Sequence, residues 1–136
     1  MDDLADRVTR GEVDTIGSDH CGYTLAQRGD SSDFSASSPG IPGVETMWPV
    51  LFTEMVTRRG MPVAQAAALV TEHPARIFGL TRKGRLAPGM DADVVLFDPS
   101  AEYALDEAAL HSGAGFSPWQ GANLKGRIVR TISRGV

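Results

Sequence analysis

The stretch KGRLAPGMDADVVLFDPS, residues 83–100, divides the chain into two parts of different character. Within it, a Pro88-Gly89 pair gives a turn signal, and the run Val94 to Phe97 is rich in residues that strands favour. Helical spacing of apolar residues dominates before residue 80, whereas short strands and turns are predicted after it. The sequence therefore predicts an α/β fold, in which an α/β unit is joined to part of a β-sandwich.

Two strands are predicted in the second part of the chain. The first covers Val94 to Phe97 and is bounded by Asp98-Pro99. The second lies within LKGRIVRTISRGV, residues 124–136, where apolar and polar residues do not separate cleanly onto the two faces of a strand. Glycines at 113, 115 and 121 fit turns between the two strands.

Three helices are predicted between residues 44 and 78. The first has an apolar face with steps of three and four, made by Val44, Met47, Trp48, Leu51, Phe52 and Met55. It closes at Gly60, and Pro49 is tolerated if the helix begins near Glu45 or Thr46, because the first N–H groups of a helix have no partner within it. The other two helices are expected at 62–71 and 74–78, each with proline at its start.

The N-terminal third combines a short helix, a strand and a long loop. Leu4, Ala5 and Val8 have helical spacing, and the helix is expected to end near Gly11. Val13 to Ile16 reads as a short strand. Residues 22–42 are rich in Ser, Gly and Asp, and a loop of this length in a compact domain is usually functional or disordered.

Length and composition exclude several classes of protein. The 136 residues fit one domain but fall short of the roughly 250 residues of a complete β/α barrel. The net charge is -4 and no basic run could follow a phosphate backbone, so no nucleic-acid partner is expected. A single cysteine, no apolar run of about 20 residues and no secretory signal predict a cytoplasmic protein without a membrane partner.

Asp19 is the strongest candidate for a chemical role. It lies just past a predicted strand, where parallel α/β folds build their active sites, and a carboxylate there could bind a metal or accept a proton from metal-bound water. The alternative is that Ser18 and Asp19 only form a turn. From spacing alone, the turn-forming role is favoured.

The remaining metal-binding side chains form no complete motif. His20 and Cys21 are adjacent, and neighbouring residues on a strand point to opposite faces, so they are not expected to bind one metal together. His73 is expected to cap or pack a helix, and His111 to favour a helix C-terminus. The sequence contains no His-x-His, Cys-x-x-Cys or His-Glu-x-x-His.

Several stretches together resemble the cyclic amidohydrolases, which include dihydropyrimidinase or hydantoinase, allantoinase and dihydroorotase. They are GEVDTIGSDHCGY, GIPGVETMWPVLF, HPARIFGL, KGRLAPGMDADVVLFDP and FSPWQGANLKGRIVRTISRGV. The resemblance implies that residues 1–80 are the last strand and C-terminal helices of a (β/α)8 barrel. Residues 81–136 would be the C-terminal portion of a β-sandwich domain.

The resemblance also implies roles for individual residues and reverses the preference at Asp19. Asp19 corresponds to the aspartate that binds one of two divalent metals, with zinc expected, and shuttles a proton from the attacking hydroxide to the leaving nitrogen. Pro39, Gly40 and Ile41 lie in the loop whose backbone holds the cyclic substrate. Hydantoinases commonly have Asn-Gly where this chain has Pro39-Gly40, and proline has no N–H, so a donor must come from Gly40 or Ile41.

The other metal ligands of the family precede the segment that this chain resembles. The chain is therefore expected to be a C-terminal fragment, produced by truncation, an abbreviated reading frame or proteolysis, which alone binds no metal and hydrolyses nothing. The complete enzyme would act on a cyclic amide of the hydantoin or dihydropyrimidine, allantoin or dihydroorotate class. The alternative is a non-catalytic oligomerisation or interaction module.

A homo-oligomer is also expected, because the apolar face of the first predicted helix would lose much of its cover outside a barrel. Association should bury this face, unless the chain rearranges to cover it.

Overall fold

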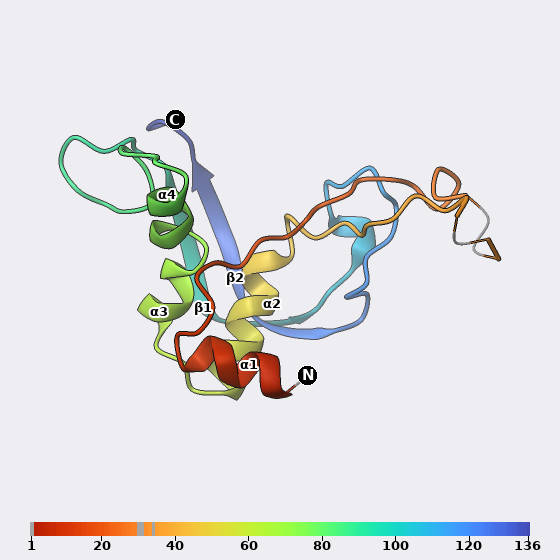
Figure 1. Ribbon diagram of the computed structural model, residues 1–136, viewed down its shortest axis with the longest axis horizontal. Helices are drawn as coiled ribbons and strands as arrows, with labels where there is room; N and C mark the ends of the chain where they lie inside the picture. Colours follow the sequence, from red (N-terminus) through yellow and green to blue (C-terminus); the bar gives the residue numbers. More distant parts are fainter. Residues whose placement is uncertain (1, 30–31, 34) are drawn as a thin grey trace.

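The computed structural model describes residues 2–29, 32–33 and 35–136. The helices are α1 (Asp2–Thr9), α2 (Met47–Leu51), η1 (Phe52–Arg58), α3 (Val63–Ala68), α4 (Glu72–Ile77) and η2 (Glu107–Ala109), and the strands are β1 (Val94–Ala104) and β2 (Asn123–Ile132). The α-helices gather beside the two strands, and the long loop after α1 extends away from them (Figure 1). None of the helices in this described part has the length and apolar character needed to cross a membrane.

The predicted helix that starts near residue 45 is present but changes its geometry half-way. α2 is an α-helix, and it runs directly into the π-helix η1, whose turns are wider. The Thr53 hydroxyl lies 2.7 Å from the Pro49 carbonyl, within the helix ladder. Side chains that insert into the ladder are a known cause of helix distortion, and the apolar periodicity alone does not reveal them.

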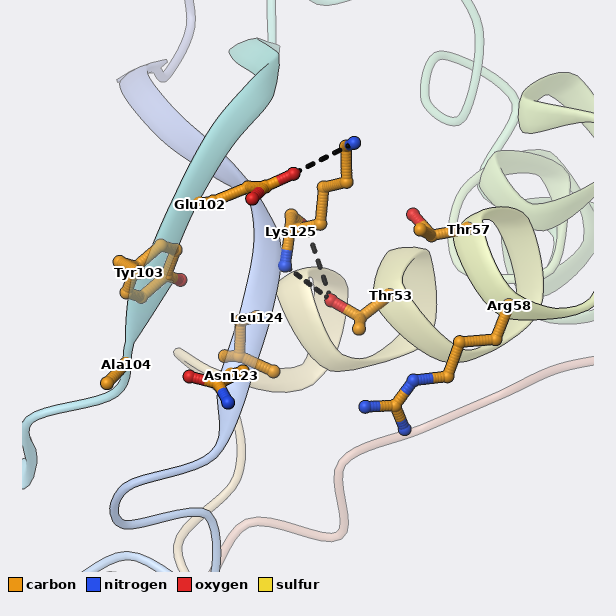
Figure 2. Close-up of a pocket in the computed structure, with 9 residues that line it drawn as sticks. All are labelled: Thr53, Thr57, Arg58, Glu102, Tyr103, Ala104, Asn123, Leu124 and Lys125. Carbon is orange, nitrogen blue, oxygen red and sulfur yellow. Dashed lines mark hydrogen bonds and ion pairs between the residues drawn. The ribbon is translucent and has the colours of Figure 1, made fainter.

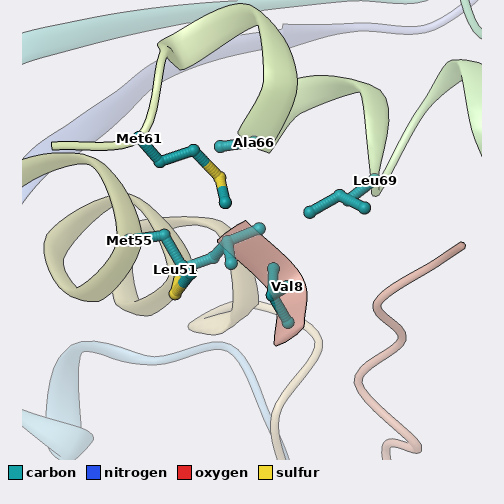
Figure 3. Close-up of a cluster of buried hydrophobic side chains, with 6 residues drawn as sticks. All are labelled: Val8, Leu51, Met55, Met61, Ala66 and Leu69. Atoms are coloured by element: carbon teal, nitrogen blue, oxygen red, sulfur yellow. The ribbon is translucent and has the colours of Figure 1, made fainter. Parts of the chain in front are cut away.

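One hydrophobic cluster joins α1 to the later helices (Figure 3). Its buried members are Val8, Leu51, Met55, Met61, Ala66 and Leu69. The side chains from α1, α2, η1 and α3 meet, so the N-terminal helix is held by residues more than forty positions away. The predicted helices at 62–71 and 74–78 are confirmed as α3 and α4, with slightly different ends.

The two strands form an antiparallel ribbon from Val94 opposite Ile132 to Ala104 opposite Asn123. Both strands are predicted from the sequence, but the prediction that the first ends at Asp98-Pro99 is wrong. β1 continues to Ala104, with the register shifted between Asp98 and Glu102. Pro99 lies inside this irregularity, where its missing N–H removes no ladder hydrogen bond.

Aromatic packing attaches the ribbon to the helices. The ring centroids of Phe52 and Phe97 are 4.7 Å apart, and those of Trp48 and Phe97 are 5.6 Å apart, both in edge-to-face arrangements. Gly126 of β2 has φ +84 and lies against the Phe97 ring, so a Cβ atom at this position would collide with it. Part of the helix face that was expected to lack cover, Trp48 and Phe52, is thus packed against the chain's own sheet, whereas Leu51 and Met55 pack in the cluster with α1 and Val44 stays exposed.

The Thr53 side chain also links η1 to β2. The backbone N–H of Lys125 donates to the Thr53 hydroxyl over 2.9 Å, and the Lys125 carbonyl lies 3.2 Å from the same oxygen (Figure 2). Thr53 is buried. Its one hydroxyl therefore meets both backbone polar groups of a single β2 residue.

The predicted strand Val13 to Ile16 is not a strand in this structure. The Ile16 N–H donates to the Leu69 carbonyl over 3.0 Å, and both Val13 and Ile16 pack against the hydrophobic cluster. A strand requires a ladder with a neighbour, and no segment among the described residues pairs with this one. The predicted loop at 22–42 is confirmed where the structure describes it, whereas Asp30, Ser31 and Phe34 lie outside the described residues.

Candidate functional site

Asp19 follows the Val13 to Ile16 segment and has a strained backbone conformation. Its φ is 44, in the left-handed region that few residues other than glycine adopt, although aspartate tolerates it better than most. The side chain is exposed to solvent. Backbone outliers of this kind cluster at functional sites, where surrounding contacts maintain them.

The loop that holds the other predicted site residues runs alongside this turn. His20 and Ile41 form a parallel bridge, and the Cys21 N–H donates to the Ile41 carbonyl over 3.0 Å. Asp19 is thereby brought close to the segment of Pro39, Gly40 and Ile41. The Ile41 side chain is 45% exposed, while its carbonyl is occupied by Cys21.

Gly40 allows this close approach. Its φ is +112, and a Cβ atom added there would collide with the side chain of Cys21. Only glycine therefore fits between the loop and the turn. Cys21 is a free thiol and is partly buried by this contact.

His20 makes a second connection that sequence reasoning missed. Its Nδ1 accepts a hydrogen bond from the Gly43 N–H over 3.0 Å and another from the Val44 N–H over 3.3 Å. Gly43 and Val44 lie 23 and 24 residues after His20, so no local sequence pattern predicts these hydrogen bonds.

A third segment reaches the same region through His111 and Glu45. One Glu45 oxygen lies 2.8 Å from the His111 Nδ1, and the other accepts from the His111 backbone N–H over 2.8 Å. The expectation that His111 serves a helix C-terminus is therefore wrong, because η2 ends at Ala109 and the ring binds a carboxylate instead. A small depression between the segments is lined by His20, Pro42, Gly43, Glu45, Thr46, Leu110 and Ser112.

A groove larger than this depression lies elsewhere among the described residues. It has a volume of about 440 Å³ and lies between η1 and the two strands (Figure 2). Its charged residues are already paired: Lys125 lies 3.1 Å from Glu102, and Arg58 lies 2.9 Å from Glu54. None of the predicted site residues lines it, so the candidate site is the Asp19 turn with its neighbouring loop.

The sequence profile of the amidohydrolase family matches residues 1–136, the whole chain. The chain belongs to the amidohydrolase family. D-phenylhydantoinase of Escherichia coli O1:K1 / APEC is 41% identical to it over 131 residues, which are 94% of this chain and 28% of that protein.

Solved structures of hydantoinases share the fold of this amidohydrolase chain. The D-hydantoinase (dihydropyrimidinase) of a Thermus species superposes with a TM-score of 0.93 at 30% identity, over 98% of this chain and 30% of that one. The dihydropyrimidinase of Brevibacillus agri NCHU1002 superposes with a TM-score of 0.94 at 30% identity, over 99% of this chain and 30% of that one. The chain thus spans less than a third of the length of these relatives.

The side chains that could bind a metal are not gathered into one group among the described residues. Amidohydrolases are generally metal-dependent, yet the described residues contain no group of three or more His, Cys, Asp or Glu that could hold a metal. The Nδ1 of His73 lies 3.0 Å from the Asp14 carbonyl. This contact joins α4 to the Val13 to Ile16 segment and does not involve Asp19. The residues that this part of the chain provides do not make a metal site by themselves.

The His111 pair gives a prediction for pH. The hydrogen bond to Glu45 and its negative charge raise the pKa of His111 above the ordinary value. Because the folded pKa is the higher one, the stabilisation is fully present below the unfolded value of about 6.5 and is lost as pH rises through the folded pKa. In an NMR titration, Glu45→Gln should lower the His111 pKa, whereas Glu102→Gln on β1 should leave it unchanged. An identical titration in the Glu45 variant would contradict the pairing.

Proposed function

We propose that this amidohydrolase segment serves the hydrolysis of a C–N bond in a cyclic amide, and that Asp19 is its acid and base. The observation that carries the proposal is the left-handed backbone conformation of Asp19, whose neighbours His20 and Cys21 are tied by backbone contacts to Ile41 of the Pro39 to Gly43 loop. The similarity of the chain to D-phenylhydantoinase favours hydantoin or dihydropyrimidine as the substrate class. Allantoin and dihydroorotate are the next candidates.

The architecture of the complete enzyme is part of the proposal. Residues 1–80 would supply the last strand and C-terminal helices of a (β/α)8 barrel, and residues 81–136 part of a β-sandwich. The TM-score of 0.93 against a D-hydantoinase supports the shared fold from which this division is proposed. The extended segment Val13 to Ile16 would then pair with barrel strands that lie outside this chain, as its polar backbone requires.

Asp19 would move one proton in each direction. As the oxygen of water bonds to the carbonyl carbon of the substrate, the carboxylate accepts the proton that this water releases. When the C–N bond breaks, the same proton passes from Asp19 to the leaving nitrogen, which departs as a neutral amine or amide group. A divalent metal, with zinc the leading candidate, would supply Lewis-acid activation when bound, with Asp19 as one of its ligands.

The neighbouring loop would hold the ring of the substrate through its backbone. Pro39 offers a carbonyl but no N–H, and the Ile41 carbonyl already accepts from Cys21. The carbonyls of Pro39 and Gly40 and the N–H of Gly40 or Ile41 are therefore the proposed contacts. A ring with alternating N–H and C=O groups, as in hydantoins and dihydropyrimidines, matches such a set.

A chimera tests the function directly. The segment of E. coli D-phenylhydantoinase that aligns with this chain would be replaced by residues 1–136, and ring opening of hydantoin, dihydrouracil, allantoin and dihydroorotate measured. We expect hydrolysis of hydantoin or dihydrouracil, since the segments are 41% identical and the fold matches hydantoinases. A folded chimera that opens none of the four rings would refute the proposal.

Self-association of the chain remains a prediction, but through a different surface than the one expected from sequence. Leu51, Phe52 and Met55 are buried within the chain, whereas Phe78 is 75% and Leu86 is 76% exposed. Light scattering after size exclusion should show a dimer or larger species, which Phe78→Ser with Leu86→Ser reduces. Leu4→Ser, at an exposed leucine of α1, is the control, and a monomeric parent chain would contradict the prediction.

A further inference from the structure

We propose that His20 is a positioning residue, whose imidazole fixes the Pro39 to Gly43 loop to the turn that carries Asp19. In its bearing on catalysis this inference rests on the proposed function. As a statement about the loop it rests only on the contacts of this chain.

The imidazole is held in one role by its hydrogen bonds. Two consecutive backbone N–H groups, of Gly43 and Val44, point at its Nδ1 over 3.0 and 3.3 Å. A backbone N–H can only donate, so these contacts require an Nδ1 without a proton, which is the tautomer with its proton on Nε2. The ring thus acts as a side-chain acceptor for the polypeptide just before α2.

His20 supplies the second of two attachment points. The first is the hydrogen bond from the Cys21 N–H to the Ile41 carbonyl, next to the close contact of Gly40 with Cys21. Between the two points lies Pro42, which is buried and has a fixed φ. One attachment would let the loop pivot, whereas two that are separated by a stiff residue set its orientation as well as its distance.

This arrangement links acid/base chemistry to substrate position. Asp19 and His20 are adjacent, so the residue that carries the proton and the residue that holds the loop belong to one turn. The loop is the part that moves if the imidazole is lost, so binding should suffer before the proton transfer does.

Asparagine and glutamine separate this role from a merely structural one. The amide of asparagine reaches the place of Nδ1 and can present an oxygen there, while that of glutamine reaches the place of Nε2. In NMR spectra of the 136-residue chain, His20→Asn should keep the Gly43 and Val44 amide shifts and slow exchange close to those of the parent. His20→Gln and His20→Ala should shift both signals and speed exchange, and His73→Asn, at a histidine that contacts the Asp14 carbonyl instead, should change neither.

Ring spectroscopy supplies an independent readout. The Nδ1 of His20 should show the nitrogen shift of an unprotonated acceptor in the parent chain. A protonated Nδ1, or Gly43 and Val44 amides that respond equally to all three His20 variants, would overturn the inference.

Kinetics of the D-phenylhydantoinase chimera distinguish the two proposals. His20→Gln should raise KM about tenfold with a smaller change in kcat, and His20→Asn should recover most of the loss. A parent chimera without activity on any ring would refute the proposed function, and the amide signals of Gly43 and Val44 would still test whether His20 holds the loop. An active chimera whose KM is unchanged by the His20 variants would refute the positioning role alone.

Discussion

Replacing Asp19 with asparagine is expected to lower the turnover of a complete amidohydrolase that carries this segment by about 10²- to 10⁴-fold. The amide can neither accept the proton of the attacking water nor return it to the leaving nitrogen. Asparagine tolerates a φ of 44 as well as aspartate does, so the turn and the fold should survive. The measurement is the rate of hydantoin ring opening by the chimera, with folding checked by circular dichroism.

Asp14 offers a matched control for this experiment. It is an exposed carboxylate five positions earlier, and its backbone carbonyl rather than its side chain contacts His73. Asp14→Asn should leave turnover within about twofold, since surface substitutions usually have small effects. Near-normal turnover in the Asp19 variant would return Asp19 to the role of a turn former.

Substituting Gly126 with alanine should destabilise the chain by about 2–5 kcal/mol. Two penalties combine: alanine resists a φ of +84, and its Cβ would collide with the ring of Phe97 and lie 3.0 Å from Phe52. Both rings belong to the contact between helix and ribbon, so the aromatic cluster must open to admit the methyl group. Urea unfolding measures the loss.

Gly121 separates the two penalties. It also has a positive φ, +74, but no atom lies within 4 Å of an added Cβ. Gly121→Ala should therefore cost only about 1–2 kcal/mol, the backbone part. Equal losses at the two glycines would show that the collision with Phe97 is relieved without cost, and that the cluster is looser than its geometry suggests.

The helices were predictable because their signal is local. Met47, Leu51 and Met55 recur at steps of four, about one helical turn each, and the strands of the ribbon carry β-branched residues. The change from α2 to η1 was not predictable, since it arises where the Thr53 hydroxyl bonds to Pro49. Val13 to Ile16 failed as a strand because pairing depends on neighbours and not on the segment's own residues.

The candidate site divides in the same way. Asp19 could be singled out because a carboxylate after a strand-like run is a local pattern. Its connection with the loop could not, because the contacts of His20 with Gly43 and of Cys21 with Ile41 each span about twenty residues. Gly40 gave no more than a turn signal, and its need to accommodate Cys21 emerges only in three dimensions.

Thr53 has a consequence for how the ribbon meets other polypeptides. An open strand edge invites a further strand, which is the first step of sheet growth and of aggregation. On β2 that edge is occupied at Lys125, whose N–H is bound to the Thr53 hydroxyl and whose carbonyl lies within 3.2 Å of it. An incoming strand would have to break this buried contact before it could align. The helix therefore blocks the addition of a strand at this position of β2.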